Sequence, residues 1–481
     1  MSLCKRLVAR LDIKGNRLIK GIRFEGLRVI GDPLQHARAY ASQGIDEILF
    51  IDSVASLYGR NSLTDILRST TRDVFVPITA GGGVRSVQDA AALLAAGADK
   101  IAVNTAALEN PELLNQLVLA FGSQCVVASI QARSIGASGW EAMSECGRER
   151  SGRNIHEWIQ DVQKLGVGEI LLTSVDNDGT CRGADLNLLD SVRDILTVPL
   201  IYSGGISSSS EVESILGAPH VYGVSIGSSF HKHSLNPADL KEYLTNSDCS
   251  DYVRARSHSR LQDKSLLPLE GKRLGIVDYG MGNQQSLVNA LEYLGSDVVL
   301  TDELELLSAC DLLFLPGVGS FPRGMSQLKD KGLDALLINL VKSGKPLIGI
   351  CLGMQMLFNS SDEFEFSSGL SLVDGHVTSI PKVDPTGTPV LLPHMGWNSL
   401  VIKSNKDFPY PSTSIQQYFV HSFVATNIPD ESLLFSTTYQ GLALTAAVHV
   451  DNLIGFQFHP ERSGIDGIEL LSASVKHLLE K

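Results

Sequence analysis

The sequence predicts an α/β protein of two domains, and three observations carry this prediction. The chain has 481 residues, 43% of them hydrophobic, which is more than one ordinary hydrophobic core serves. In the first half, short apolar strands alternate with helical stretches, as in parallel sheets covered by helices. A polar stretch without periodicity at 246–271 then precedes a fresh apolar strand, RLGIVDYG. We therefore expect domains at 1–245 and 272–481, joined by a linker at 246–271.

The strand count of the first domain predicts its architecture. The strand-like segments are RLVARLDI, EILFIDSV, PITAGGG, KIAVNT, CVVASIQ, EILLTSVD, PLIYSGG and GVSIGS. About eight strands with intervening helices in a domain of this length are typical of a (β/α)8 barrel. The domain also repeats itself, because PITAGGGVRS (77–86) resembles PLIYSGGISS (199–208). We therefore expect a barrel built of two similar halves.

The repeat places Asp12, near the end of the first strand, over Gln131 in VVASIQARS (126–134). Catalytic residues of such barrels lie at the carboxyl ends of the strands, so these two side chains should face each other across the barrel mouth. Because the repeat sets position 131 over Asp12, an acid is expected at both positions. A glutamine amide forms hydrogen bonds but exchanges no proton near neutral pH. The sequence thus predicts Asp12 as a catalytic carboxylate and Gln131 as a substrate-binding residue.

Two glycine-rich turns indicate phosphate sites. Backbone amides approach a phosphate closely only where no side chain blocks them. One such turn alone is weak support, because plain turn chemistry also uses glycine, but two symmetry-related turns imply a substrate with a phosphate at each end. The first site would comprise Gly82, Gly83, Asn104 and Thr105, and the second Gly204, Gly205, Gly227 and Ser228.

The second domain contains the pattern of a nucleophile elbow. In KPLIGICLGMQML (345–357) an apolar strand breaks at Cys351 into a helix, whose N-terminus favours the thiolate. Alone, Cys351 would more often be a buried structural thiol. However, GFQFHPERSG (455–464) supplies His459 and Glu461, which point the same way on an extended strand. A base oriented by a carboxylate completes a triad with Cys351.

Composition excludes several classes of function. The net charge of −13 disfavours binding to nucleic acid or to an anionic membrane. The start, MSLCKRLVARLDIKG, has no long apolar run, so we expect a cytoplasmic location. The seven cysteines show no paired spacing, which favours reduced thiols. The aspartates are scattered over strand ends without a ligand cluster, so we expect neither a metal nor an organic cofactor.

On these motifs, residues 272–481 resemble the triad (class I) glutamine amidotransferases, and residues 1–245 resemble the cyclase of imidazole glycerol phosphate synthase. The resemblance implies that Cys351 attacks the glutamine amide, that His459 acts as general base and acid, and that Glu461 orients it. It also implies further glutaminase residues. Val318 and Gly319 of the PGVG turn, with Leu352, would form the oxyanion hole, Gly353 and Gln355 would line the glutamine pocket, and Met395, Trp397 and Asn398 of PHMGWN would face the barrel. The segment YFVHSF (418–423) also matches.

For the barrel, the resemblance implies a charged gate through which ammonia enters, formed by Arg6, Glu47, Lys100 and Glu169. Any one of these residues alone could be an ordinary surface charge. Lys20 matches the lysine of a mobile first loop, and Asp52, Asp176 and Asp178 match acidic positions around the mouth. The implied reaction joins ammonia to the N1-phosphoribulosyl formimino aminoimidazole carboxamide nucleotide. It yields imidazole glycerol phosphate and aminoimidazole carboxamide ribonucleotide.

Gln131 departs from the family pattern, because this reaction moves protons at two places on the substrate. Three interpretations stay open. In the first, Asp178 or Asp52 takes over the missing proton transfer. In the second, the barrel binds a different phosphorylated compound, or it passes ammonia to an acceptor enzyme, as for an amidino sugar of a surface glycan. In the third, the barrel only docks and activates the glutaminase. Fusion raises the effective concentration of each domain for the other. Pairing within one chain and pairing between two chains are both compatible with the sequence.

Overall fold

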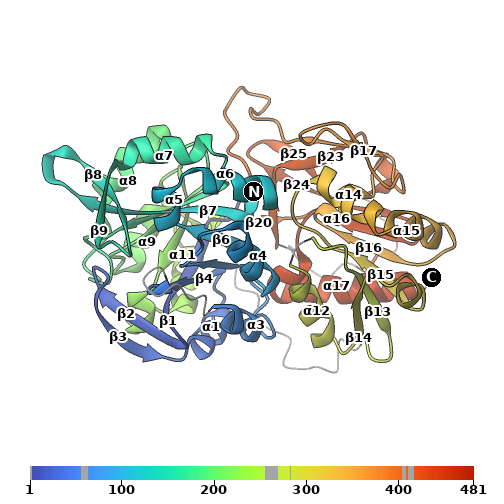
Figure 1. Ribbon diagram of the computed structural model, residues 1–481, viewed down its shortest axis with the longest axis horizontal. Coiled ribbons are helices and arrows are strands. Elements are labelled where there is room, and N and C mark those ends of the chain that lie inside the picture. Colours follow the sequence, from blue (N-terminus) through green and yellow to red (C-terminus); the bar gives the residue numbers. More distant parts are fainter. Residues whose placement is uncertain are drawn as a thin grey trace. The chain divides into compact units, whose positions relative to one another are not determined.

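The computed structural model describes residues 3–55, 63–254, 269–281, 283–403, 408–409 and 416–480. The described residues form two compact units (Figure 1). One lies within residues 4–254, and the other comprises described residues of 269–390 and 394–480. No helix among the described residues is long and apolar enough to cross a membrane.

The first unit is a closed barrel of parallel strands surrounded by helices (Figure 1). In ring order the strands are β1 (Arg6–Lys14), β4 (Glu47–Asp52), β5 (Ile78–Gly81), β6 (Lys100–Val103), β7 (Val126–Ser134), β10 (Glu169–Ser174), β11 (Leu200–Ser203) and β12 (Val221–Ile226). The pairing of β12 with β1 closes the ring. The predicted (β/α)8 barrel is therefore confirmed.

Several helices of the barrel begin where a side chain accepts from an amide of the first turn. The barrel helices are α1 (Pro33–Ser42), α3 (Leu63–Thr70), α4 (Val87–Ala95), α5 (Thr105–Glu109), α6 (Glu112–Phe121), α7 (Ile155–Lys164), α8 (Leu186–Val192), α9 (Ser209–Gly217), α10 (Ser228–His231) and α11 (Pro237–Thr245). Ser86 accepts from the amide of Asp89, and Ser208 accepts from that of Glu211. These equivalent caps follow the two glycine-rich turns, as the half-barrel repeat predicts.

Each of the two symmetry-related strands leads into an antiparallel hairpin at the mouth. After β1 come β2 (Arg17–Ile22) and β3 (Glu25–Gly31), and after β7 come β8 (Trp140–Ser144) and β9 (Glu149–Asn154). The first hairpin carries Lys20 back over the end of β1, where Asp12 pairs with Ile19. The hairpins therefore bring additional side chains to the carboxyl ends of the strands.

Alternation along β1 arranges the barrel interior in layers. Side chains two residues apart on a strand point to the same face. Arg6, Val8, Arg10 and Asp12 are all buried, with at most 3% of each residue exposed. Val8 belongs to an apolar cluster with members from other strands, namely Leu49, Ile51, Ala102, Val127, Leu171 and Ile201. An apolar layer therefore separates the charged residues at the amino ends of the strands from those at the mouth.

Part of the expected linker packs on the barrel. Val253 pairs with Lys5, and Arg254 donates to the buried carboxylate of Asp46 at 2.8 Å. The 3-10 turn Ser250–Tyr252 precedes these contacts. The rest of the expected linker lies outside the described residues until 269.

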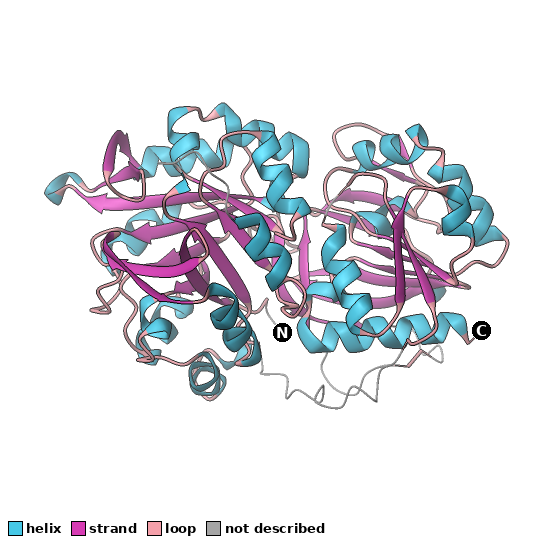
Figure 2. Ribbon diagram, turned by 60° about the horizontal axis from the view of Figure 1, so that its bottom comes forward, coloured by secondary structure: helices cyan, strands magenta, loops and turns pink. Residues whose placement is uncertain are grey.

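The second unit is built on a mixed sheet flanked by helices (Figure 2). Its strands in spatial order are β14 (Asp297–Thr301), β13 (Arg273–Val277), β15 (Leu312–Leu315), β16 (Leu347–Ile350), β26 (Leu453–Phe456), β25 (Leu442–Val450), β24 (Leu433–Tyr439) and β21 (Val401–Ile402). The first five run parallel and the others are antiparallel to their neighbours. The helices are α12 (Gln284–Tyr293), α13 (Leu304–Ser308), α14 (Phe321–Asp330), α15 (Leu333–Lys342), α16 (Leu352–Met356) and α17 (Gly464–Leu479).

Two small sheets complete this unit. One pairs β20 (His394–Ser399) with β22 (Gln416–His421). The other comprises β18 (Ser367–Ser368), β17 (Ser360–Ser361), β19 (His376–Ser379) and β23 (Phe423–Thr426). Tyr418 of β22 accepts from the backbone amide of His459, and Phe423 of β23 accepts from the side chain of Gln355.

Candidate active site

Cys351 lies at the turn between β16 and α16, with φ 53° and ψ −110°. This conformation is costly for a residue with a side chain, and such strain is typical of a nucleophile elbow. The backbone amide of Cys351 donates to Phe456 of β26 at 2.7 Å. The elbow is therefore fixed by the adjacent strand, and Cys351 is only 6% exposed.

The predicted base and its carboxylate form a close pair. Nδ1 of His459 lies 2.7 Å from Oε1 of Glu461. Burial alone would lower the pKa of His459, but Cys351 and Glu461 outweigh it and raise that pKa well above its usual value. The local structure differs from the expected extended strand, because Glu461 lies in the 3-10 turn Pro460–Arg462 that follows β26. The two-residue spacing brings the carboxylate to the imidazole by a turn.

Of the expected oxyanion residues, Val318 and Gly319 lie between β15 and α14, and Leu352 begins α16. Gly319 has φ 119°, which glycine tolerates. Leu352 follows the nucleophile, and its amide donates to the carbonyl oxygen of Gly317 at 3.3 Å. The hydroxyl of Tyr279 holds the same turn by donating to Pro316 at 2.7 Å. An oxyanion that binds the backbone amide of Leu352 must therefore replace the long hydrogen bond from this amide to Gly317.

The two residues expected to line the glutamine pocket have different roles in the structure. A side chain at Gly353 would meet the carbonyl oxygen of Leu315 at 1.6 Å, so glycine lets α16 approach β15 closely. Nε2 of Gln355 donates to Phe423 and to the side chain of Gln457, at 3.1 Å each. These two acceptors therefore fix the side-chain amide of Gln355.

Glu363 is a buried carboxyl group beside the start of α14 that the sequence analysis missed. It is 7% exposed and accepts from the amide of Phe321 at 2.7 Å, at the start of α14. Burial raises its pKa from the ordinary 4.5 to about 7. Its position twelve residues after Cys351, in a polar segment, gave no local signal of burial.

Replacing Glu363 with glutamine should change how stability depends on pH. The raised pKa means that the folded protein binds more protons than the unfolded chain between about pH 4.5 and 7. The contribution of Glu363 to the free energy of unfolding is therefore largest below this window. It falls by about 3 kcal/mol as the pH rises through the window. Urea unfolding should show that Glu363→Gln stabilises the protein more at pH 8 than at pH 5. An equal effect at both values would contradict the assignment.

At the barrel mouth, Asp12 is held by two cations. It accepts from Nε of Arg10 at 2.9 Å and from Nζ of Lys20 at 2.6 Å. Lys20 also lies 3.1 Å from Asp178. Burial would raise the pKa of Asp12, but Arg10 and Lys20 outweigh it and hold that pKa far below its usual range. Asp12 is therefore ionised in the ligand-free protein, and Asp178 belongs to the same ion cluster.

Arg10 is the second residue that the sequence analysis missed. Its Nη1 lies 3.3 Å from Oγ1 of Thr173 on β10 and 3.4 Å from Oγ of Ser203 on β11. Thr173 is the register partner of Gln131. The guanidinium therefore reaches from β1 to strands of the other half-barrel. The available signal was a charged residue two positions before Asp12, on the same face of the strand.

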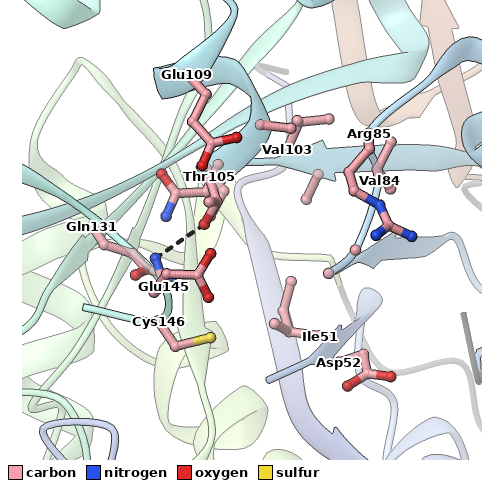
Figure 3. Close-up of a pocket in the computed structure, with 16 residues that line it drawn as sticks. Ile51, Asp52, Val84, Arg85, Val103, Thr105, Glu109, Gln131, Glu145 and Cys146 are labelled. Atoms are coloured by element: carbon pink, nitrogen blue, oxygen red, sulfur yellow. Dashed lines mark hydrogen bonds between the residues drawn. The ribbon is translucent and has the colours of Figure 1, made fainter. Parts of the chain in front are cut away.

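Gln131 lines a cavity of about 130 Å³ at the mouth (Figure 3). The first predicted phosphate turn lines the same cavity, through Gly82, Gly83, Asn104 and Thr105, and so does Asp52. Figure 3 shows Glu145 beside Gln131. The backbone amide of Glu145 donates to the hydroxyl of Thr105 at 3.0 Å. Oε1 of Gln131 is buried and has no hydrogen-bond partner among the described residues. That oxygen is available to a donor on a ligand.

The second predicted phosphate turn lines a separate, smaller cavity. Gly204, Gly205, Gly227 and Ser228 lie around it, together with Asp178 and Ser203. At Gly205 the positive φ of 81° and a carbonyl oxygen 2.0 Å from any added Cβ exclude a side chain. The mouth thus has two glycine-lined cavities, one in each half-barrel.

The four expected gate residues form a closed ring of alternating charge. Arg6 bonds Glu47 at 2.9 Å and also bonds Glu169. Lys100 lies 2.7 Å from each of the same two carboxylates. All four side chains are at most 1% exposed, so they are not ordinary surface charges. The ring lies at the amino ends of the strands, below the apolar layer.

The two units match two different families of known proteins. Residues 6–236 match the family described as histidine biosynthesis protein, and residues 275–477 match glutamine amidotransferase class-I. Over 206 residues, 43% of this chain and 97% of the relative, the chain is 52% identical to the imidazole glycerol phosphate synthase subunit HisF of Legionella pneumophila. The chain belongs to the imidazole glycerol phosphate synthase family. The same subunit of Mycobacteroides abscessus is 44% identical over 249 residues, and that of Streptococcus sanguinis is 41% identical over 242.

Those two alignments each cover 50% of this chain and 96% of the relative. The predicted resemblance is confirmed for both regions. The chain is an enzyme that joins a HisF-like cyclase barrel and a class I glutamine amidotransferase domain, as in the bifunctional synthase of histidine biosynthesis.

Proposed function

We propose that this chain hydrolyses glutamine at Cys351 and uses the ammonia at Asp12 in the barrel mouth. The acceptor is the phosphoribulosyl formimino nucleotide, which becomes imidazole glycerol phosphate and aminoimidazole carboxamide ribonucleotide. One observation carries the proposal most directly: Asp12 lies at the mouth with two glycine-lined cavities suited to the two phosphates of this substrate.

In the glutaminase, the thiolate of Cys351 attacks the amide carbon of glutamine, and His459 gives a proton to the departing ammonia. Water deprotonated by His459 then hydrolyses the thioester, which releases glutamate and restores the thiolate. Glu461 holds the imidazole by its Nδ1 atom and stabilises its charged form. The raised pKa of His459 supports this arrangement of charges.

The barrel interior offers ammonia a path from the charged ring to the mouth. Arg6 and Asp12 lie on the same face of β1, separated by Val8 of the apolar layer. Ammonia is small and neutral, so an apolar layer hinders it less than it hinders ammonium. In this structure the ring is closed by its own ion pairs, and passage requires one of them to open.

Ring closure requires protons to move at two places on the substrate, and only one of the symmetry-related strands supplies an acid. Asp12 is ionised before the reaction and accepts a proton in it, as the base. We assign the second proton transfer to Asp178, which Lys20 connects to Asp12. Gln131 then orients the substrate by accepting a hydrogen bond at its unpartnered oxygen.

A double-mutant cycle tests this assignment. Asp178→Asn should lower ammonium-dependent product formation by about 10²-fold or more. Gln131→Asp restores an acid on the symmetry-related strand, so it should rescue the Asp178→Asn variant by at least about tenfold. Gln131→Asn, which keeps an amide, is the matched control and should give no rescue. If Asp178→Asn retains full activity, the second acid lies elsewhere.

A further inference from the structure

Two buried histidines face each other in the glutaminase unit. His394 on β20 and His421 on β22 are register partners and are 0% and 3% exposed. Nδ1 of His394 lies 2.9 Å from Nε2 of His421. Neither belongs to the Cys351 triad. Burial lowers the pKa of both, to about 4 for His421, so both imidazoles are neutral near pH 7.

The neighbouring groups determine which nitrogen carries each proton. The side chain of Asn398 accepts from the amide of Ser399 at 2.9 Å and donates to Thr438 at 2.9 Å. Its Nδ2 therefore also donates to Nε2 of His394, at 3.3 Å. A neutral His394 that accepts at Nε2 must carry its proton on Nδ1 and donate to His421.

The same sense of donation continues beyond His421. Because Nε2 of the neutral His421 accepts from His394, Nδ1 of His421 carries the proton. It donates to the carbonyl oxygen of Phe423 at 2.8 Å. That oxygen also accepts from Nε2 of Gln355, which fixes the orientation of the Gln355 amide. The second hydrogen of this nitrogen points to Oε1 of Gln457 at 3.1 Å.

The network ends at the nucleophile. Because Oε1 of Gln457 accepts from Gln355, the group that Gln457 turns toward the sulfur is its NH₂, and Nε2 lies 3.9 Å from Sγ of Cys351. Gln457 is fully buried, so water does not compete for this contact. A donor directed at a sulfur stabilises the thiolate relative to the thiol.

We propose that Gln457 donates a hydrogen bond to the Cys351 thiolate, and that His394 and His421 are positioning residues that keep this donor, rather than the amide oxygen, facing the sulfur. This inference rests on the proposed glutaminase role of Cys351 and adds a group to it. Among the described residues, the other titratable groups near the sulfur are His459, with Glu461 behind it, and the hydroxyl of Tyr279.

The test measures the pH dependence of Cys351 alkylation in the full chain. Iodoacetamide is added without glutamine, and mass spectrometry follows the peptide that carries Cys351, since other thiols also react. Gln457→Met removes the donor at similar size and should move the alkylation midpoint up by about one pH unit. The turnover number for glutamine should fall about tenfold at neutral pH, with KM changed less than about twofold. An unchanged midpoint overturns the proposal.

Gln457→Glu keeps the shape of the side chain and carries the test where the methionine variant does not fold. It should shift the midpoint upward further, because a carboxylate repels a thiolate. A midpoint equal to that of the unaltered protein would again contradict the proposal.

The histidine pair is tested at a distance from the sulfur. His394→Gln should move the midpoint in the same direction by a smaller amount, because the orientation of His421 is then no longer fixed. His376→Gln is the matched control: its imidazole bonds Ser360 and Asp362 in the same unit, outside this network. Equal midpoints for the two variants would restrict the role to packing. If the unaltered protein neither hydrolyses glutamine nor reacts at Cys351, the glutaminase proposal itself fails.

Discussion

Replacing Cys351 with alanine should abolish product formation from glutamine, lowering its rate by about 10⁶-fold, as removal of a triad nucleophile does. The reason is that the imidazole of His459, which Glu461 holds, loses the thiol at the elbow that it activates. Product formation from ammonium should stay within about twofold of its normal rate, because Asp12 and its ion cluster lie in the other unit.

The matched control for this prediction is Cys310→Ala. Cys310 is a buried thiol of the same unit that donates to Leu306 at 3.3 Å and has no role in the proposed mechanism. It should retain glutamine hydrolysis, measured as glutamate release. Glutamate release by Cys351→Ala at a rate near normal would show that the second unit has been misinterpreted.

Asp12→Asn should lower product formation about 10²- to 10⁴-fold with either nitrogen source, which corresponds to roughly 3 to 5.5 kcal/mol of barrier. The amide keeps the size of the side chain but supplies no base. It also leaves Arg10 and Lys20 without the carboxylate between them. Glutamine hydrolysis should continue, because Cys351 is unchanged.

Asp176→Asn provides the control for charge at the mouth. Its carboxylate accepts from the backbone amide of Ser134 on β7 at 2.8 Å. Its effect should be less than about threefold. If Asp12→Asn and Asp176→Asn lose activity equally, the effect is one of general charge and Asp12 is not the base.

The fold was largely predictable because its signals are local. The apolar strands, the glycine turns and the break at Cys351 depend on neighbouring residues, and the half-barrel repeat then related Asp12 to Gln131. The HPE segment was predicted to bring its two side chains together, but by an extended strand. Pro460 begins a 3-10 turn there instead, which the two-residue spacing alone did not distinguish.

The missed residues depend on contacts between distant parts of the chain. Arg10 acquires its meaning from Thr173 and Ser203, more than 160 residues away. The buried pair of His394 and His421 arises only when β20 pairs with β22. No periodicity or short motif predicts such contacts. Sequence patterns located the catalytic strands, whereas the electrostatic setting of Asp12 required the assembled barrel.

The central claim is that one chain couples glutamine hydrolysis to ring closure in a barrel that carries Gln131. The most direct measurement supplies the purified protein with the phosphoribulosyl formimino nucleotide, glutamine labelled with ¹⁵N in the amide, and unlabelled ammonium in the solution. Chromatography and mass spectrometry then follow both products. The account predicts aminoimidazole carboxamide ribonucleotide together with imidazole glycerol phosphate that carries ¹⁵N in its ring. Glutamate release without either product would contradict it, and would indicate that the ammonia serves another acceptor.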